Sequence, residues 1–281
     1  DADDRSAVLR AAEASGQLEV SGRGWKSLPD LPRSLKLLDI SKNQLTGQAL
    51  LAAWHRSWPE HCQLQILRAA ENCLGDEDAE GDLVPTILSS LQLRELDLSH
   101  NGLQLRQLGA WSGLSAARLS FLDFTGNPLS SAPLPALVLE VCPHLQELRL
   151  RRCGLTHLDV RLEPHGLGTL DLEENRLTSL PPELLQALPR LKALLLANNE
   201  LRSSLPTEFG FWESLQVVSL TGNPLRALRQ ALLAKGWPAV AQHLRDRAPE
   251  QVTVEPEPLT GRPGAEAASR PDTPETARLV R

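Results

Sequence analysis

The stretch LGTLDLEENRLTSLPPELLQALPRLKALLLANNEL, from Leu167 to Leu201, contains one eleven-residue pattern twice. The pattern is L-x-x-L-x-L-x-x-N-x-L, and it starts at Leu167 and again 24 residues later at Leu191. Leu170 and Leu172 alternate with other residues, which predicts a short strand with its leucines on one face. Asn175 is predicted to turn the chain, because its amide can bond the unpaired backbone of neighbouring turns. One such coil cannot bury its own apolar side, so the pattern predicts a stack of coils.

Related turns recur along most of the chain. Eight positions correspond to Asn175, including Asn175 itself: Asn43, Asn72, Asn101, Asn127, Cys153, Asn175, Asn199 and Asn223. Their spacing falls from 29 residues at the start to 24 at the end, and the longer early coils have room for helices at 48–58 and 83–91. The predicted fold class is therefore α/β, a solenoid with a curved parallel sheet and eight repeats between two helical caps.

The two ends of the chain depart from the pattern. An alanine-rich helix is expected over 3–15, followed by a degenerate strand at 18–20, so residues 1–30 form an N-terminal cap and 31–225 the repeats. A helix, a break at Gly236 and a second helix with Pro238 in its first turn make residues 226–247 the second cap. Residues 248–281 contain six prolines and few large apolar side chains, so we expect a disordered or extended tail.

Composition argues against several classes of function. The net charge is −6, which is unfavourable for a general binder of nucleic acid, and no apolar run is long enough to insert into a membrane. The first residues lack a signal peptide, and because the sequence contains no methionine we expect the natural chain to start upstream of Asp1. The four cysteines have no metal-site spacing and no N-x-S/T sequon occurs, so we expect reduced thiols in a cytoplasmic compartment.

No motif for catalysis or cofactor binding is present. The sequence lacks phosphate-binding glycine loops, H-E-x-x-H and G-x-S-x-G, and its seven histidines show no regular partner spacing. We therefore predict that the protein is not an enzyme and that it holds no cofactor or metal.

The repeated pattern resembles the cytoplasmic leucine-rich-repeat superfamily over roughly Leu18 to Arg247. More narrowly, VLRAAEASGQLEVSGRGWKSLPD at the start and NPLRALRQALLAKGWPAVAQHLRDR at the end are similar to an intracellular group with L-P repeats, related to Ras-suppressor and plant Ras-group repeat proteins. The resemblance implies a scaffold or adaptor that binds other proteins and carries no active site.

If the protein binds a partner, the concave face of the sheet is the expected surface. The third strand positions of the coils alternate in charge, which suggests lateral ion pairs between strands. Large apolar residues and arginines, which interaction hot spots favour, occur on the same face. The predicted protein-binding residues are Ile66, Arg68, Asp97, Phe121, Asp123, Arg149, Arg151, Arg152 and Asp171.

Two functions remain open from the sequence. The first is a scaffold or adaptor that binds a protein partner through the concave face. The alternative is a structural subunit built permanently into a large assembly, such as a cytoskeletal or ciliary complex.

Overall fold

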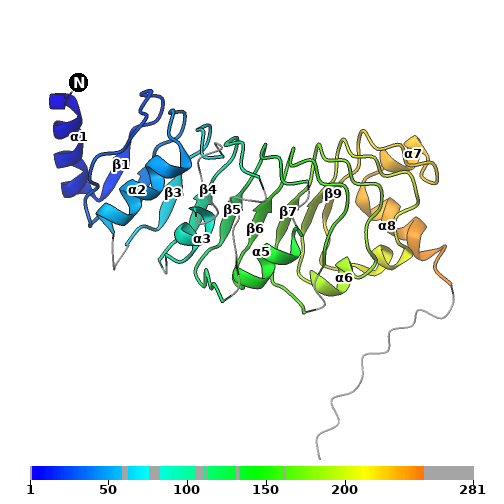
Figure 1. Ribbon diagram of the computed structural model, residues 1–281. Helices are drawn as coiled ribbons and strands as arrows, with labels where there is room; N and C mark the ends of the chain where they lie inside the picture. The colour runs from blue at the N-terminus through cyan, green and yellow to red at the C-terminus, as the bar shows by residue number, and fades with distance from the viewer. Residues whose placement is uncertain are drawn as a thin grey trace, which may run out of the picture. The chain divides into compact units, whose positions relative to one another are not determined.

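The computed structural model describes residues 2–58, 63–75, 83–90, 92–104, 111, 113–130, 133–160 and 163–249. Nine parallel strands form one sheet in chain order (Figure 1). The strands are β1 (Gln17–Glu19), β2 (Leu37–Asp39), β3 (Ile66–Arg68), β4 (Glu95–Asp97), β5 (Phe121–Asp123), β6 (Glu147–Arg149), β7 (Thr169–Asp171), β8 (Ala193–Leu195) and β9 (Val217–Ser219). The predicted α/β solenoid with a parallel sheet is confirmed.

The core follows from the alternation of leucines. The middle residue of each strand points inward, and these residues pair in one row from Leu18 and Leu38 through Leu194 and Val218. Residues of the first strand were expected at 18–20, but β1 lies one position earlier because Leu18 stands in register with Leu38. Stacking therefore places each leucine against its counterparts in the neighbouring coils, which is how a solenoid buries its core.

Several helices return the chain on one side of the sheet, and others stand at its two ends (Figure 1). They are α1 (Ala2–Ser15), α2 (Gly47–Ser57), α3 (Leu83–Leu88), α5 (Ala136–Val141), α6 (Leu184–Ala187), the 3-10 helix η1 (Thr207–Phe211), α7 (Gln230–Leu233) and α8 (Trp237–Arg245). The helix expected over 48–58 is α2, whose N-cap Thr46 accepts a hydrogen bond from the Ala49 amide at 3.1 Å. The helix expected over 83–91 is shorter, since α3 ends at Leu88, and residue 91 lies outside the described residues.

The turn asparagines form a buried column along the strand ends. Asn127 is typical: its Nδ2 donates to the carbonyls of Leu98 and Phe124, while its Oδ1 accepts from the amides of Asn101 and Leu103. Where the column has a cysteine, the Cys153 thiol lies 3.3 Å from the same Phe124 carbonyl. Each amide thus satisfies backbone groups of its own coil and of the preceding coil.

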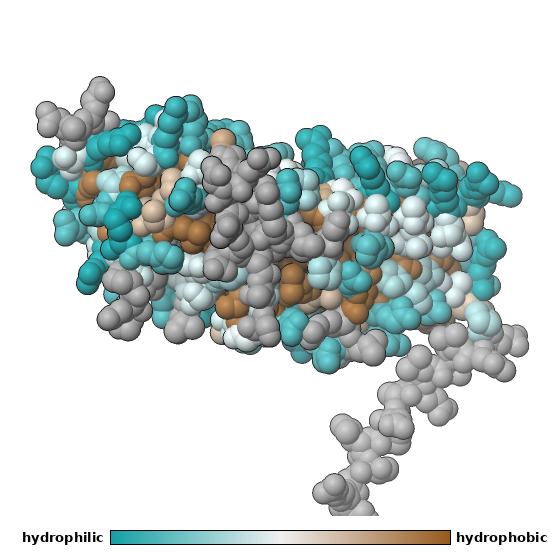
Figure 2. Space-filling model, viewed as in Figure 1, coloured by the Kyte–Doolittle hydropathy of each residue, from teal (hydrophilic) through white to brown (hydrophobic). Residues whose placement is uncertain are grey.

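A left-handed residue precedes each member of this column. Its φ is +53° to +56° at Lys42, Glu71, His100, Arg152, Glu174 and Asn198, and glycine stands there at Gly126 and Gly222. L residues adopt this conformation at a cost, so the ladder imposes it on six non-glycine residues. On the upper edge in Figure 2, where these turns lie, the surface is largely hydrophilic.

Helices pack at both ends of the stack. Gly16, at φ +71°, ends α1 as expected. At the other end, α8 buries Trp237, Val240 and Leu244 and packs on η1. The chain divides into the unit Asp1–Ala248 and the unit Pro249–Arg281, and the predicted tail lies outside the described residues from 250 onward. The finer division at residues 30 and 225 stays a prediction.

Candidate functional site

The face of the sheet opposite the helices carries the first and third residues of every strand, and we call it the open sheet face. Side chains there are half-buried or exposed in all strands except at Asp123. The strands place seven predicted site residues on this face: Ile66 and Arg68 on β3, Asp97 on β4, Phe121 and Asp123 on β5, Arg149 on β6 and Asp171 on β7. The other two, Arg151 and Arg152, lie in the turn after β6.

Phe121 and Arg149 contact each other across neighbouring strands. The Arg149 guanidinium carbon lies 4.9 Å from the centre of the Phe121 ring, which is cation-π geometry. The same guanidinium pairs with Glu147 at 2.6 Å and with Asp123 at 3.6 Å. Arg149 is therefore oriented by a ring and two carboxylates, while 44% of its side chain stays exposed.

Two hollows flank this pair. One, of about 250 Å³, is lined by Leu67, Arg68, Glu95, Asp97 and Phe121. The other, of about 360 Å³, has a more polar lining: Ser99, His100, Asp123, Thr125, Glu147, Arg149, Arg151, Thr169, Asp171 and Leu195. Seven of the nine predicted residues thus line a depression, and Ile66 and Arg152 do not line either of the two.

The prediction that alternating charges form lateral ion pairs is correct for one pair and wrong for another. Asp123 pairs with Arg149, but Arg68 pairs with Glu95 at 3.6 Å rather than with the third-position aspartate Asp97. The aspartates instead close turns, because a carboxylate oxygen accepts the amide two residues later at 2.7 to 2.9 Å. This holds for Asp39, Asp97, Asp123 and Asp171. Sequence reasoning missed this role, although Asp-x-Ser and Asp-x-Thr after a strand would have indicated it.

Asp123 is buried rather than exposed as the sequence suggested. Only 10% of its side chain is accessible, because it lies between neighbouring strands and folds back onto the Thr125 amide. Desolvation raises the pKa of the Asp123 carboxyl above its ordinary value, and it does the same to the pKa of Asp171. These two carboxylates carry a cost of burial that their turn hydrogen bonds only partly offset.

The predicted arginine cluster divides into two groups. Only Arg149 contacts Phe121, whereas Arg151 and Arg152 both bind the carboxylate of Glu174 in the next coil. These two arginines lower the pKa of Glu174. Arg151 and Arg152 therefore already have a carboxylate partner, and Arg149 is the arginine of this group that lies beside Phe121 on the open sheet face.

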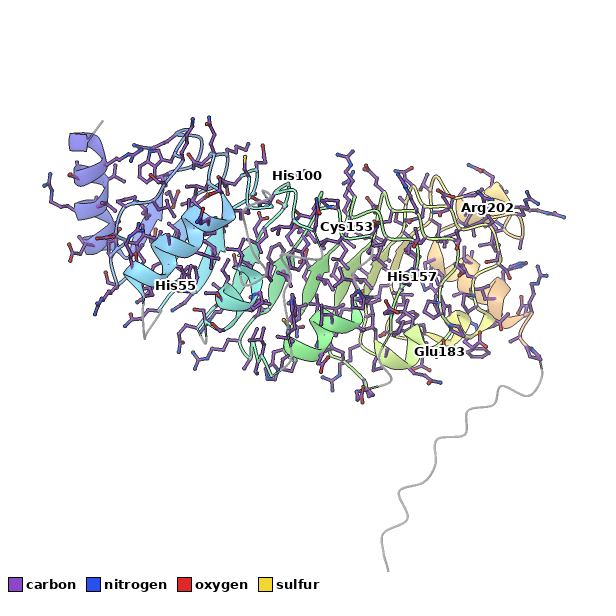
Figure 3. All side chains as sticks on the ribbon, viewed as in Figure 1. His55, His100, Cys153, His157, Glu183 and Arg202 are labelled. Atoms are coloured by element: carbon purple, nitrogen blue, oxygen red, sulfur yellow. The ribbon has the colours of Figure 1, made fainter. Side chains whose placement is uncertain are left out.

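The histidine, cysteine and acidic side chains of the described residues do not cluster into a metal site. Within the described residues no three of His, Cys, Asp and Glu are placed to hold a metal ion. Figure 3 shows His55, His100 and His157 well separated along the solenoid. In the described part of the chain, no helix combines the length and the apolar character needed to span a lipid bilayer.

Comparison with known proteins agrees with the repeat geometry. The family described as "Leucine rich repeat" matches residues 92–114, 143–201 and 165–225. Human podocan-like protein 1 is 30% identical over 90% of this chain, which spans 51% of that relative.

Two solved structures are also similar. A leucine-rich-repeat protein of Leptospira interrogans superposes with a TM-score of 0.58 at 26% identity, covering 79% of this chain and 53% of that one. Human trophoblast glycoprotein superposes with a TM-score of 0.56 at 25% identity, covering 76% and 79% respectively. The asparagine column, the parallel sheet and these matches together show that the chain folds as a leucine-rich-repeat solenoid.

Proposed function

We propose that the protein is a non-catalytic scaffold that binds a protein partner through the open sheet face, centred on Phe121 and Arg149. The leucine-rich-repeat fold supports protein binding in general. The observation that carries the proposal is the contact between an aromatic ring and a guanidinium, with a hollow on each side. Aromatic and arginine side chains beside depressions are the usual anchors of protein interfaces.

The linings of the hollows suggest which partner groups fit. The smaller hollow has Leu67 and Phe121 as apolar walls and Arg68, Glu95 and Asp97 around them. An apolar partner side chain inserted there would cover the ring of Phe121 while a polar rim excludes water. The larger hollow offers Arg149 and Arg151 beside Asp123 and Asp171, which suits a partner with charges of both signs.

We further propose that the protein acts as an adaptor in a reducing, cytoplasmic-type compartment. Three cysteines have no disulfide partner within the described residues, and Cys142 and Cys153 are buried thiols. No N-x-S/T sequon occurs in the sequence. The coiled stack needs no covalent bridge, because the asparagine column already links coil to coil.

A quantitative pull-down with a matched control tests the binding face. We expect the double variant Phe121→Ala, Arg149→Ala to lose at least about tenfold in affinity for captured partners, since hot-spot truncations cost about 2 kcal/mol or more. Val217→Ala is the control, because Val217 is 53% exposed on the same face but lines neither hollow of the open sheet face. Equal capture by all three proteins, with cross-links confined to the helical side, would refute the proposal.

A further inference from the structure

The last strand leaves one edge of the sheet unpaired. β9 pairs with β8 on one side only. The Val217 amide donates to Lys192, and the Ser219 and Thr221 carbonyls accept from Leu196 and Asn198, so residues 217, 219 and 221 face β8. Residues 218, 220 and 222 face the other way, because the two sides of a strand alternate.

Two amides on this edge lack the partner that their equivalents have in other coils. The Leu196 amide donates to Ser219 at 2.9 Å and the Asn198 amide to Thr221 at 2.7 Å, and the same two bonds recur in earlier coils. In the final coil the equivalent amides belong to Leu220 and Gly222. Neither has a hydrogen-bond partner among the residues that the structure describes. Unpaired amides along a strand edge are a template for another strand.

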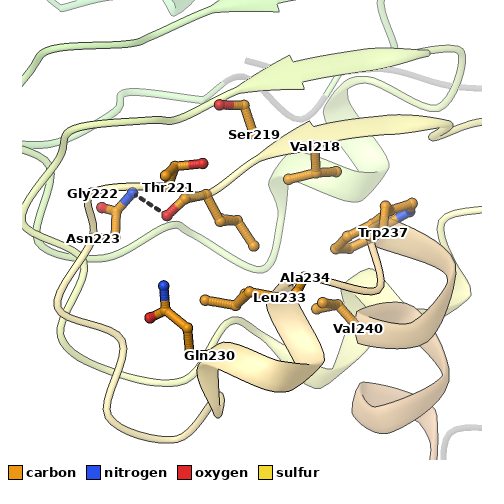
Figure 4. A pocket seen from close by; sticks show the side chains of 12 residues that line it. Val218, Ser219, Thr221, Gly222, Asn223, Gln230, Leu233, Ala234, Trp237 and Val240 are labelled. Atoms are coloured by element: carbon orange, nitrogen blue, oxygen red, sulfur yellow. Dashed lines mark hydrogen bonds between the residues drawn. The ribbon is translucent and has the colours of Figure 1, made fainter.

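A pocket of about 310 Å³ gives access to this edge (Figure 4). Residues 218 to 223 form one wall, and α7 and α8 form the other through Gln230, Leu233, Trp237 and Val240. Asn223 donates to the Leu220 carbonyl across this wall at 3.1 Å, which leaves the Leu220 amide as the available group. The cap helices therefore stand away from the strand edge instead of closing over it.

The cap beside the pocket is basic although the whole chain is acidic. Residues 225–248 contain five arginines and lysines against one aspartate, in a chain of net charge −6. Four of them, Arg226, Arg229, Lys235 and Arg247, are exposed and form no ion pair with any described residue. Exposed cations without an ion pair to a described residue also occur elsewhere, for example Lys26, Lys36 and Lys192, so it is the local excess of positive charge that distinguishes the cap.

We propose that the open edge of β9 binds an acidic protein segment in extended conformation, as a tenth strand of the sheet. Backbone groups of the segment bond the Val218, Leu220 and Gly222 edge, alternate apolar side chains enter the pocket, and carboxylates meet the unpaired cap arginines and lysine. A second copy of this chain fits less well, since a symmetric pairing of two β9 edges would bring two basic caps together. This surface is separate from the open sheet face.

Fluorescence anisotropy with synthetic probes tests the chemistry. We expect the protein to bind a short fluorescein-labelled peptide of alternating glutamate and valine. The analogue with lysine in place of glutamate should not bind, because it meets like charges. An analogue with every backbone amide N-methylated should not bind either, because it has no backbone donors. Binding of the lysine analogue at equal strength, or no binding of the acidic peptide, overturns the proposal.

Variants separate the strand edge from the charge. Val218→Pro removes an amide on the unpaired edge of β9 without breaking a hydrogen bond to β8. We expect it to weaken peptide binding at least about tenfold relative to Val218→Ala. The double variant Arg226→Glu, Arg229→Glu should cause a similar loss with an unchanged thermal melt. If Val218→Pro does not fold, slower hydrogen exchange of the Leu220 and Gly222 amides on peptide binding to the wild type is the second measure of strand addition.

Two results would contradict strand addition. One is unaltered exchange of these amides in the presence of saturating peptide. The other is tighter binding of single-stranded oligodeoxythymidylate than of the acidic peptide, which would make the cap a polyanion site. The Phe121→Ala, Arg149→Ala variant should bind the acidic peptide like the wild type. A failure of strand addition at β9 can therefore be distinguished from a failure of partner binding at the open sheet face.

Discussion

Arg149 on β6 lies over the ring of Phe121 on β5, with 4.9 Å between the guanidinium carbon and the ring centre. Strand register alone places Phe121 opposite Glu147 and Arg149 opposite Asp123, so the contact is diagonal. It joins an apolar anchor to a positive charge at the boundary between the two hollows of the open sheet face.

Phe121 and Arg149 should be coupled in stability. In a double-mutant cycle with alanine at each position, we expect a coupling free energy of about 0.5–1 kcal/mol, the range for exposed cation-π pairs. Urea denaturation followed by circular dichroism measures it. A cycle of Phe121 with Arg68, which lines the smaller hollow but pairs with Glu95, serves as the control and should show weaker coupling. Strictly additive effects of Phe121 and Arg149 would contradict the contact.

The asparagine column should be strongest in its interior. Asn127 is fully buried and its amide serves four backbone groups, so Asn127→Ala should lower the free energy of unfolding by about 3–5 kcal/mol. Asn223→Ala in the last coil should cost clearly less, because that side chain is only half-buried. Chemical denaturation of both variants checks the order, and the reverse order would refute the role assigned to burial.

Gly126 should tolerate a side chain poorly. Its φ is +74°, and an added Cβ would lie 2.4 Å from the His100 Nδ1 atom. Gly126→Ala should therefore lower the free energy of unfolding by about 1–2 kcal/mol because of the backbone conformation alone. The clash with His100 should lower it further. In a His100→Ala background the clash is gone and only the backbone cost should remain. An identical cost of Gly126→Ala in both backgrounds would show that the histidine moves aside freely.

Stability should depend on the ionisation of Asp123. Its pKa is raised in the folded protein by desolvation, so the folded state binds more protons than the unfolded state between the ordinary aspartate pKa of 3.8 and the raised value. The contribution of Asp123 to stability therefore falls as the pH rises through this window. Asp123→Asn should show a smaller loss of stability on going from acidic to neutral pH, measured by urea denaturation. Asp39→Asn is the control, since Asp39 makes the same turn hydrogen bond from a half-buried position.

Cysteine reactivity should follow burial. Cys73 is exposed, whereas burial raises the pKa of both Cys142 and Cys153 to about 12. Iodoacetamide at neutral pH should modify Cys73 within minutes and leave the two buried thiols intact until the protein is denatured. Mass spectrometry of the peptides gives the result. Rapid labelling of Cys153 in the native protein would show that the column opens at that coil.

The candidate site was predictable only in part from the sequence. Register alone places Phe121 and Arg149 on the open sheet face, because residues that flank an inward leucine must point outward. Register did not reveal that Arg151 and Arg152 both bind the Glu174 carboxylate. Nor did it reveal that Arg68 pairs with Glu95 or that the Asp123 side chain is buried. These contacts depend on which side chains of the adjacent coils lie within reach. Because the coils differ in length, the sequence separation between contacting residues varies from coil to coil.

The sequence by itself determined the stack, since the leucine at the centre of most of the three-residue strands and the turn asparagine that usually follows can be satisfied only by further coils. Tertiary structure decided where the stack ends and what its surfaces offer. The Leu220 amide has the same local sequence setting as that of Leu196, yet it is unpaired because no coil follows and the cap helices stand apart from β9. A pattern of local residues specifies the bonds that a coil can make, whereas the presence of a neighbour in space specifies which of them are made.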